Sequence, residues 1–101
     1  MTESLDKLKH LYLGMPKFED DTDEDLRKIF TKYIPILAFI ATNENLRISI
    51  SGLTDRVDDI DILISAVNTS NSIQDREIFF KKATAILRAD IKSLIVIIEK
   101  L

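Results

Sequence analysis

A cluster of acidic side chains is the part of this sequence best suited to act on another molecule. The cluster comprises Asp55, Asp58, Asp59 and Asp61, and such a concentration of negative charge attracts a basic partner over a distance. A charged run beside an apolar stripe is also typical of a solvated helix face. We therefore predict an exposed acidic surface here, with recognition of a basic protein as its functional interpretation.

Asp90 is the acidic residue that could act alone. It lies one helical turn from Ile86 and from Leu94, on an otherwise apolar flank. Burial raises the pKa of a carboxyl group unless a cation pairs with it, and enzymes build acids and bases in this way. Because aspartate is seldom buried, we expect Asp90 at the edge of the core. An enzyme that uses it is our third functional hypothesis.

Cysteine and histidine, which build many metal sites and nucleophilic catalytic sites, are nearly missing. The sequence has no cysteine, and His10 is its only histidine, which excludes disulfides, thiolate metal sites and multi-histidine sites within one chain. Only two glycines are present, far apart, so no glycine-rich phosphate loop can form. We predict no catalytic residue, no metal and no cofactor.

The composition indicates one folded domain spanning residues 1–101. Of the 101 residues, 46% are apolar and 31% charged, as in a helical protein with a single core. The net charge of −3 opposes attraction to phosphates, which disfavours nucleic acid as a partner. The longest apolar run, residues 94–98, is too short to span a membrane. Without a signal-like N-terminus, we expect a cytoplasmic protein.

Apolar spacing in the first half predicts two helices. The first covers residues 3–13 and is ended by Gly14 and Pro16. The second begins near residue 22 and continues through Pro35, where the missing N–H predicts a kink. Its apolar stripe consists of Leu26, Phe30, Tyr33, Leu37 and Ile40.

The second half carries the most regular pattern, which predicts two further helices. From about residue 43, alternating steps of four and three form the heptad seam of a coiled coil, made of Leu46, Ile50, Leu53, Val57, Ile60, Ile64 and Val67. After a capping pair at Ser72 and Asp75, the last helix is lined by Phe80, Leu87, Ile91, Leu94, Ile98 and Leu101. We predict an all-α fold: a four-helix up-down bundle, or a helical hairpin with two shorter N-terminal helices.

Residues 46–51 admit an alternative, because they also alternate apolar and polar side chains before Gly52, as in a strand. One strand followed by two helices resembles the ribbon-helix-helix DNA-binding proteins. That resemblance implies contacts to the DNA major groove from Arg47 and Ser49. The acidic residues that follow oppose the approach of phosphates, so DNA binding is the second hypothesis.

Our leading hypothesis is a non-catalytic helical protein-interaction module: an adaptor, an inhibitor or an immunity-type binding protein. Ile48 and Ile62 lie off the main seam and add apolar groups for a second interface. The predicted partner-binding residues are therefore Ile48, Asp55, Asp58, Asp59, Asp61 and Ile62. The partner is another protein or a second copy of the chain in a homodimer.

Overall fold

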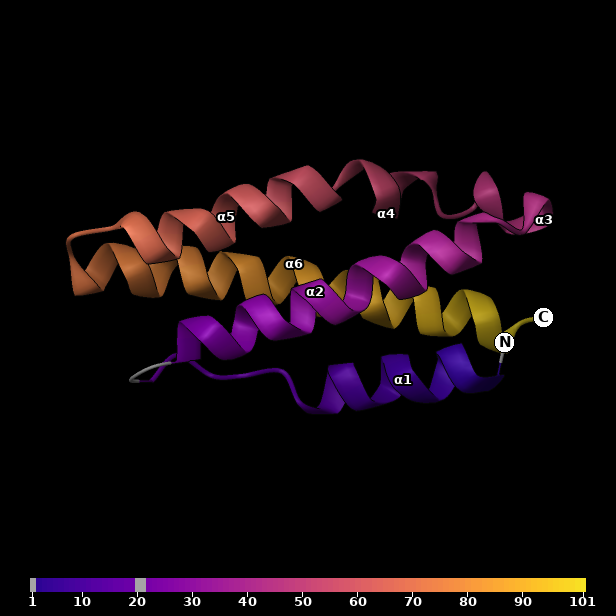
Figure 1. Ribbon diagram of the computed structural model, residues 1–101, viewed down its shortest axis with the longest axis horizontal. Coiled ribbons are helices and arrows are strands. Elements are labelled where there is room, and N and C mark those ends of the chain that lie inside the picture. The colour runs from indigo at the N-terminus through magenta and orange to yellow at the C-terminus, as the bar shows by residue number, and fades with distance from the viewer. Residues whose placement is uncertain (1, 20–21) are drawn as a thin grey trace.

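The computed structural model describes residues 2–19 and 22–101, and its regular secondary structure is helical throughout (Figure 1). The helices are α1 (Thr2–Leu13), α2 (Thr22–Ala41), α3 (Glu44–Arg47), α4 (Ser51–Asp55), α5 (Val57–Thr69) and α6 (Ile73–Glu99). The described residues include no strand. The prediction of an all-α fold is confirmed. None of the described helices has the length and apolarity needed to cross a membrane.

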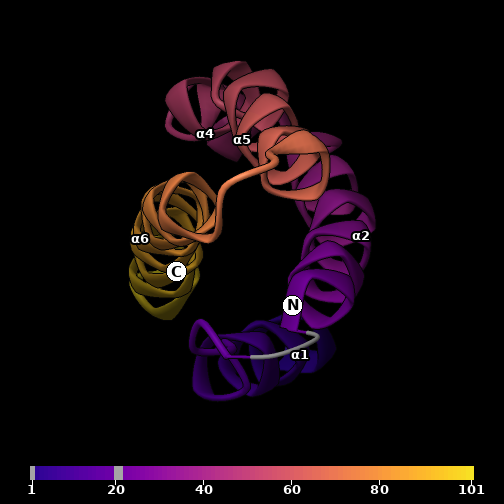
Figure 2. The ribbon, with the colours of Figure 1, turned by 90° about the vertical axis from the view of Figure 1, so that its left-hand side faces the viewer.

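The longer helices run along the long axis of the molecule, and each turns back along the one before it (Figure 1). Seen from one end, α1, α2, α5 and α6 are arranged around the interior in that order (Figure 2). The contact between α5 and α6 is the most extensive, and α6 also packs against α1 and α2. Because α2 has 20 residues and α5 has 13, the expectation of two shorter N-terminal helices fits α1 but not α2.

The predicted apolar stripes form the core. All five stripe residues of α2 are buried. Every seam residue between 46 and 67 is buried except Val57, which is half-buried. In α6 the stripe is buried from Phe80 to Ile98. Leu101 follows the end of α6 and is exposed, so its predicted place in that stripe is wrong.

Pro35 lies inside α2, which continues through it as one helix. Proline has no N–H, so the carbonyl of Thr31 lacks its usual donor four residues later. Both residues are exposed, and water can therefore satisfy that carbonyl. The buried stripe keeps its register on both sides of Pro35, from Phe30 to Leu37.

The segment from residue 43 to residue 56 differs from both predictions. Residues 46–51 comprise the end of α3, a turn and the start of α4, so the strand alternative is wrong. A single helix through the heptad seam is also wrong, because the chain leaves the helix at residues 48–50 and again at Arg56.

Local hydrogen bonds explain where these short helices begin and end. The side chain of Asn43 accepts a hydrogen bond from the Asn45 N–H and caps α3. The Ser51 hydroxyl donates to the Ile48 carbonyl at 3.0 Å, and such side-chain bonds compete with helix propagation. Gly52 weakens the next helix further. Leu46, Ile50 and Leu53 still point inward, so the seam survives the two interruptions.

Candidate functional site

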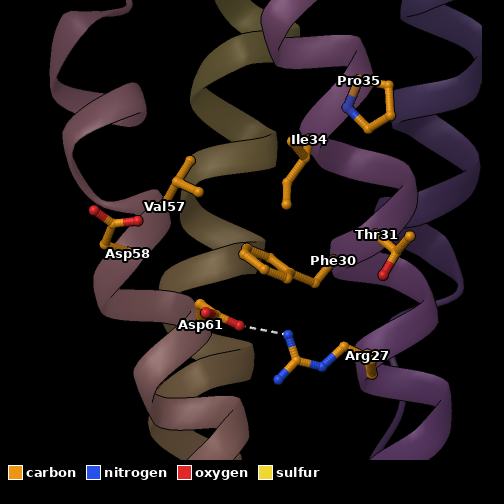
Figure 3. Close-up of a pocket in the computed structure, with 8 residues that line it drawn as sticks. All are labelled: Arg27, Phe30, Thr31, Ile34, Pro35, Val57, Asp58 and Asp61. Carbon is orange, nitrogen blue, oxygen red and sulfur yellow. Dashed lines mark hydrogen bonds and ion pairs between the residues drawn. The ribbon is translucent and has the colours of Figure 1, made fainter.

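A groove between α2 and α5 lies beside the predicted partner-binding residues (Figure 3). Its volume is about 430 Å³, and it is lined by Arg27, Phe30, Thr31, Ile34, Pro35, Val57, Asp58 and Asp61. Figure 3 shows Phe30 directed from α2 toward α5, with Ile34 above its ring. Phe30 is buried, whereas Ile34 is 38% exposed. The floor of the groove is therefore apolar and reaches solvent.

An ion pair between Arg27 and Asp61 crosses one end of this groove (Figure 3). Arg27 Nη1 lies 2.5 Å from Asp61 Oδ1, and its Nη2 donates to the Ser65 hydroxyl at 3.2 Å. The guanidinium carbon also lies 5.8 Å from the centre of the Phe30 ring, within the range of a cation–π contact. Asp61 therefore binds α2 of its own chain, and a partner would meet this carboxylate already paired.

The other three aspartates of the cluster are exposed and have different surroundings. Asp58 lines the groove, and together with Asp59 it lies in the first turn of α5. Carboxylates in a first turn stabilise the helix through its dipole, so these two residues also have a structural role. Asp55 is the last residue of α4. The described residues contain no group of three or more acidic or histidine side chains placed to hold a metal ion.

The two predicted isoleucines are exposed, but the structure does not bring them together. Ile62 is 65% exposed and lies on α5, one turn after Asp58. Ile48 is 85% exposed and lies in the turn between α3 and α4, at the end of the molecule opposite the α5–α6 loop (Figure 1). Ile62 does not line the α2–α5 groove, but it follows Asp61, which does, on the same helix.

Arg47 and Ser49, the residues of the DNA-binding alternative, lie in a helix end and a turn. Arg47 ends α3, and its Nε donates to the Ala41 carbonyl at 3.4 Å. Ser49 is exposed in the following turn. Without a strand at residues 46–51, these side chains do not form the paired ribbon that the alternative needs.

Asp90 is buried, which corrects the expectation that it lies at the edge of the core. It is 3% exposed, and its carboxylate accepts from Arg56 Nε at 3.0 Å through Oδ1 and at 2.9 Å through Oδ2. Arg56 Nη2 also lies 2.8 Å from Oδ1. A buried carboxylate needs a paired cation, and Arg56 is the cation that pairs with Asp90.

Tyr33 lies in the same electrostatic environment. Its hydroxyl is buried and has no hydrogen-bond partner among the described residues. Burial raises the pKa of Tyr33, the Asp90 charge raises it further, and Arg56 opposes the shift. The hydrogen bond to Asp90 raises the pKa of Arg56 in turn. Neither Tyr33 nor Asp90 lines a groove beside α2, so a substrate in those grooves would not touch them.

Sequence reasoning missed Arg27, Ile34 and Arg56. Arg56 precedes buried Ile60 by four residues, and this spacing is typical of two side chains on one helix face. It was therefore the signal that Arg56 could reach the core and pair with Asp90. Arg27 and Ile34 matter because α5 lies beside that flank of α2, which no local pattern reveals. No protein-family model, curated protein or solved structure matches the chain.

Proposed function

We propose that the chain is a non-catalytic protein-interaction module of the adaptor, inhibitor or immunity type. It is built as a four-helix up-down bundle with α2 bent at Pro35. The α2–α5 groove carries this proposal, because its apolar floor reaches solvent at Ile34 and the Asp58 carboxylate lines the same groove. Apolar centres with polar rims are the usual anatomy of protein interfaces.

The partner surface consists of this groove and the neighbouring exposed face of α5. Ile34 and Ile62 supply apolar anchors, while Asp58 and Asp59 supply negative charge. An amphipathic helix with basic residues beside its apolar stripe fits this combination, since such helices commonly dock in grooves between helices. Its basic residues would be steered by the acidic face.

The proposal includes self-association, with a second copy of the chain as one form of partner at the same surface. We also propose a cytoplasmic location. The chain has no cysteine, so it forms no disulfide and does not need an oxidising compartment. Sedimentation equilibrium tests self-association directly. If the homodimer forms through this surface, Ile62→Asp should shift the monomer–dimer equilibrium toward the monomer.

In-cell crosslinking followed by quantitative mass spectrometry tests the partner surface. The site variants are Ile62→Asp and Asp58→Lys. Ile73→Asp is the control for the first, because Ile73 is also 65% exposed but begins α6. Asp25→Lys is the control for the second, because Asp25 is likewise exposed in the first turn of a helix yet does not line the groove.

We expect one protein to be captured by the wild type and by both controls and to be lost from both site variants. Circular dichroism confirms that each variant stays folded. Capture that is unchanged in both site variants, or lost equally in the controls, would contradict the proposed surface.

A further inference from the structure

A second groove lies on the other side of α2, where α1 packs against it. Its volume is about 510 Å³, and it is lined by Lys7, His10, Leu11, Thr31, Lys32, Pro35 and Ile36. A smaller hollow of about 260 Å³ shares Lys7, Pro35 and Ile36 with it and is also lined by Glu3, Ser4 and Phe39. The two hollows are therefore neighbours along α1 and α2, and together they are here called the α1–α2 groove.

Apolar side chains form the floor of the α1–α2 groove. Leu11 and Ile36 lie at the edge of the core, each with a small exposed fraction. Pro35 is exposed between them and the α2–α5 groove. Phe39 is 60% exposed at the far end. This floor suits a hydrocarbon chain or ring rather than a fully polar ligand.

The ionisable side chains around the larger hollow are all basic, although the net charge of the chain is −3. Lys7, His10 and Lys32 contribute side chains, and no carboxylate lines this part of the groove. Within residues 2–19 and 22–101, Lys32 and His10 have no acidic group at ion-pair distance. Lys7 lies 3.2 Å from Glu3, and both side chains are largely exposed, so a bound anion competes with that weak pair easily.

We propose that the α1–α2 groove binds a small amphipathic carboxylate of the fatty-acid type. The hydrocarbon part lies along Leu11, Pro35 and Ile36 toward Phe39, and the carboxylate lies among Lys7, His10 and Lys32. Charge complementarity selects this occupant at the larger hollow, because Lys7, His10 and Lys32 accompany an apolar floor there, whereas Glu3 lines the smaller hollow. The volume falls in the range typical of small-molecule sites. This site does not depend on the proposed partner surface, which lies across α2.

Titration of the uniformly ¹⁵N-labelled full chain with decanoate, followed by amide NMR shifts, tests the proposal. Decyltrimethylammonium carries the same hydrocarbon chain with the opposite charge, and hexanoate carries the same head group with a shorter chain. We expect decanoate to shift amides of α1 and of residues 31–39, and to bind more tightly than either comparison ligand. No saturable shift with decanoate, equal affinity for decyltrimethylammonium, or shifts confined to α5 would overturn the proposal.

Two pairs of variants separate binding in the groove from general effects. Lys32→Glu replaces attraction by repulsion and is expected to weaken decanoate binding about tenfold. Lys28→Glu is its control, because Lys28 lies one turn earlier on α2, is exposed and does not line the groove. Equal weakening by both variants would show that net charge alone governs binding, and it would count against the site.

Phe39→Ala tests the apolar end of the groove. We expect it to weaken decanoate several-fold and to leave hexanoate unchanged, because the shorter chain does not reach Phe39. Ile78→Ala is the control, since Ile78 is an exposed apolar residue on α6, away from the groove. Both sites of change are on the surface, so the fold is expected to survive. A loss of decanoate affinity in Ile78→Ala equal to that in Phe39→Ala would refute the assigned position of the chain.

Discussion

The guanidinium of Arg56 ties the junction between α4 and α5 to the buried carboxylate of Asp90 in α6. Arg56 is the single residue between α4 and α5, and its side chain is 44% exposed, whereas that of Asp90 is 5% exposed. The carboxylate is thus removed from water while its cation remains partly hydrated. Breaking such a pair from the cationic side leaves an uncompensated charge in the core.

Arg56→Met is therefore expected to lower the free energy of unfolding by roughly 2 to 4 kcal/mol, with some relief because water can reach the vacated position. Urea denaturation measures this loss. Arg27→Met is the matched control, because the Arg27–Asp61 pair lies at the surface and is worth at most about 1 kcal/mol. Arg56→Met combined with Asp90→Leu should recover much of the stability. Equal losses for the two single arginine variants would contradict this account.

Tyr33→Phe is expected to leave stability at neutral pH unchanged or to raise it by up to about 1 kcal/mol, since the buried hydroxyl has no protein partner among the described residues. The variant should also change the alkaline limb of the stability profile. Burial raises the pKa of Tyr33 in the folded state, so above about pH 10 the unfolded chain releases this proton while the folded chain keeps it. The wild type therefore loses stability as the pH rises, by linkage.

Denaturation from pH 7 to pH 11 checks this, with Tyr12→Phe as the control. Tyr12 is a half-buried tyrosine of α1, and Lys92 Nζ lies over its ring. The difference between wild type and Tyr33→Phe should change with pH above about 10. A difference that stays constant across that range would contradict the proposed protonation of Tyr33.

Pro35→Ala is expected to raise the free energy of unfolding by about 1 to 3 kcal/mol, because it restores an N–H donor for the Thr31 carbonyl within α2. Pro16→Ala is the control: Pro16 lies outside the helices, so its loss only increases the freedom of the unfolded chain and should be mildly destabilising. Thermal and urea denaturation report both. A destabilised Pro35→Ala would mean that packing around the ring outweighs the missing hydrogen bond.

Gly52→Ala is expected to stabilise the chain by about 0.5 to 1 kcal/mol, since Gly52 is helical in α4. A methyl group there would meet only Arg56 Nη1, at an ordinary 3.7 Å. At Gly14 the same group would lie 3.2 Å from the His10 carbonyl, so Gly14→Ala should gain less or lose stability. The reverse order of the two variants in urea denaturation would contradict this reasoning.

The core could be predicted from the sequence because burial follows apolar periodicity. Leu26, Phe30 and Leu37 repeat at helical spacing and are buried as that spacing requires. The helix breaks at residues 48–50 and at Arg56 could not be predicted in this way. Short helices separated by such brief interruptions keep the same spacing of buried residues. Leu46, Ile50 and Leu53 point inward whether the helix is continuous or interrupted.

The surface and its electrostatics were less predictable, because they depend on contacts between distant residues. Arg56 and Asp90 lie 34 residues apart. The general tendency of aspartate to be exposed does not reveal that a distant arginine pairs with it. The acidic run suggested free charge at Asp61, whereas α2 supplies Arg27 as its partner. Likewise, both grooves beside α2 are formed by residues of two helices. Their shape follows from helix placement rather than from a local motif.

The short helices between residues 43 and 56 affect the order in which parts of the molecule unfold. Helices of four and five residues, as in α3 and α4, are far too short to persist by themselves. Their backbone hydrogen bonds therefore last only while a few buried side chains and the Arg56 anchor stay in place. We expect the amide protons of residues 44–55 to exchange with solvent deuterium through a partial opening that leaves α6 intact. Residues 44–55 would then unfold and refold independently while α6 stays helical.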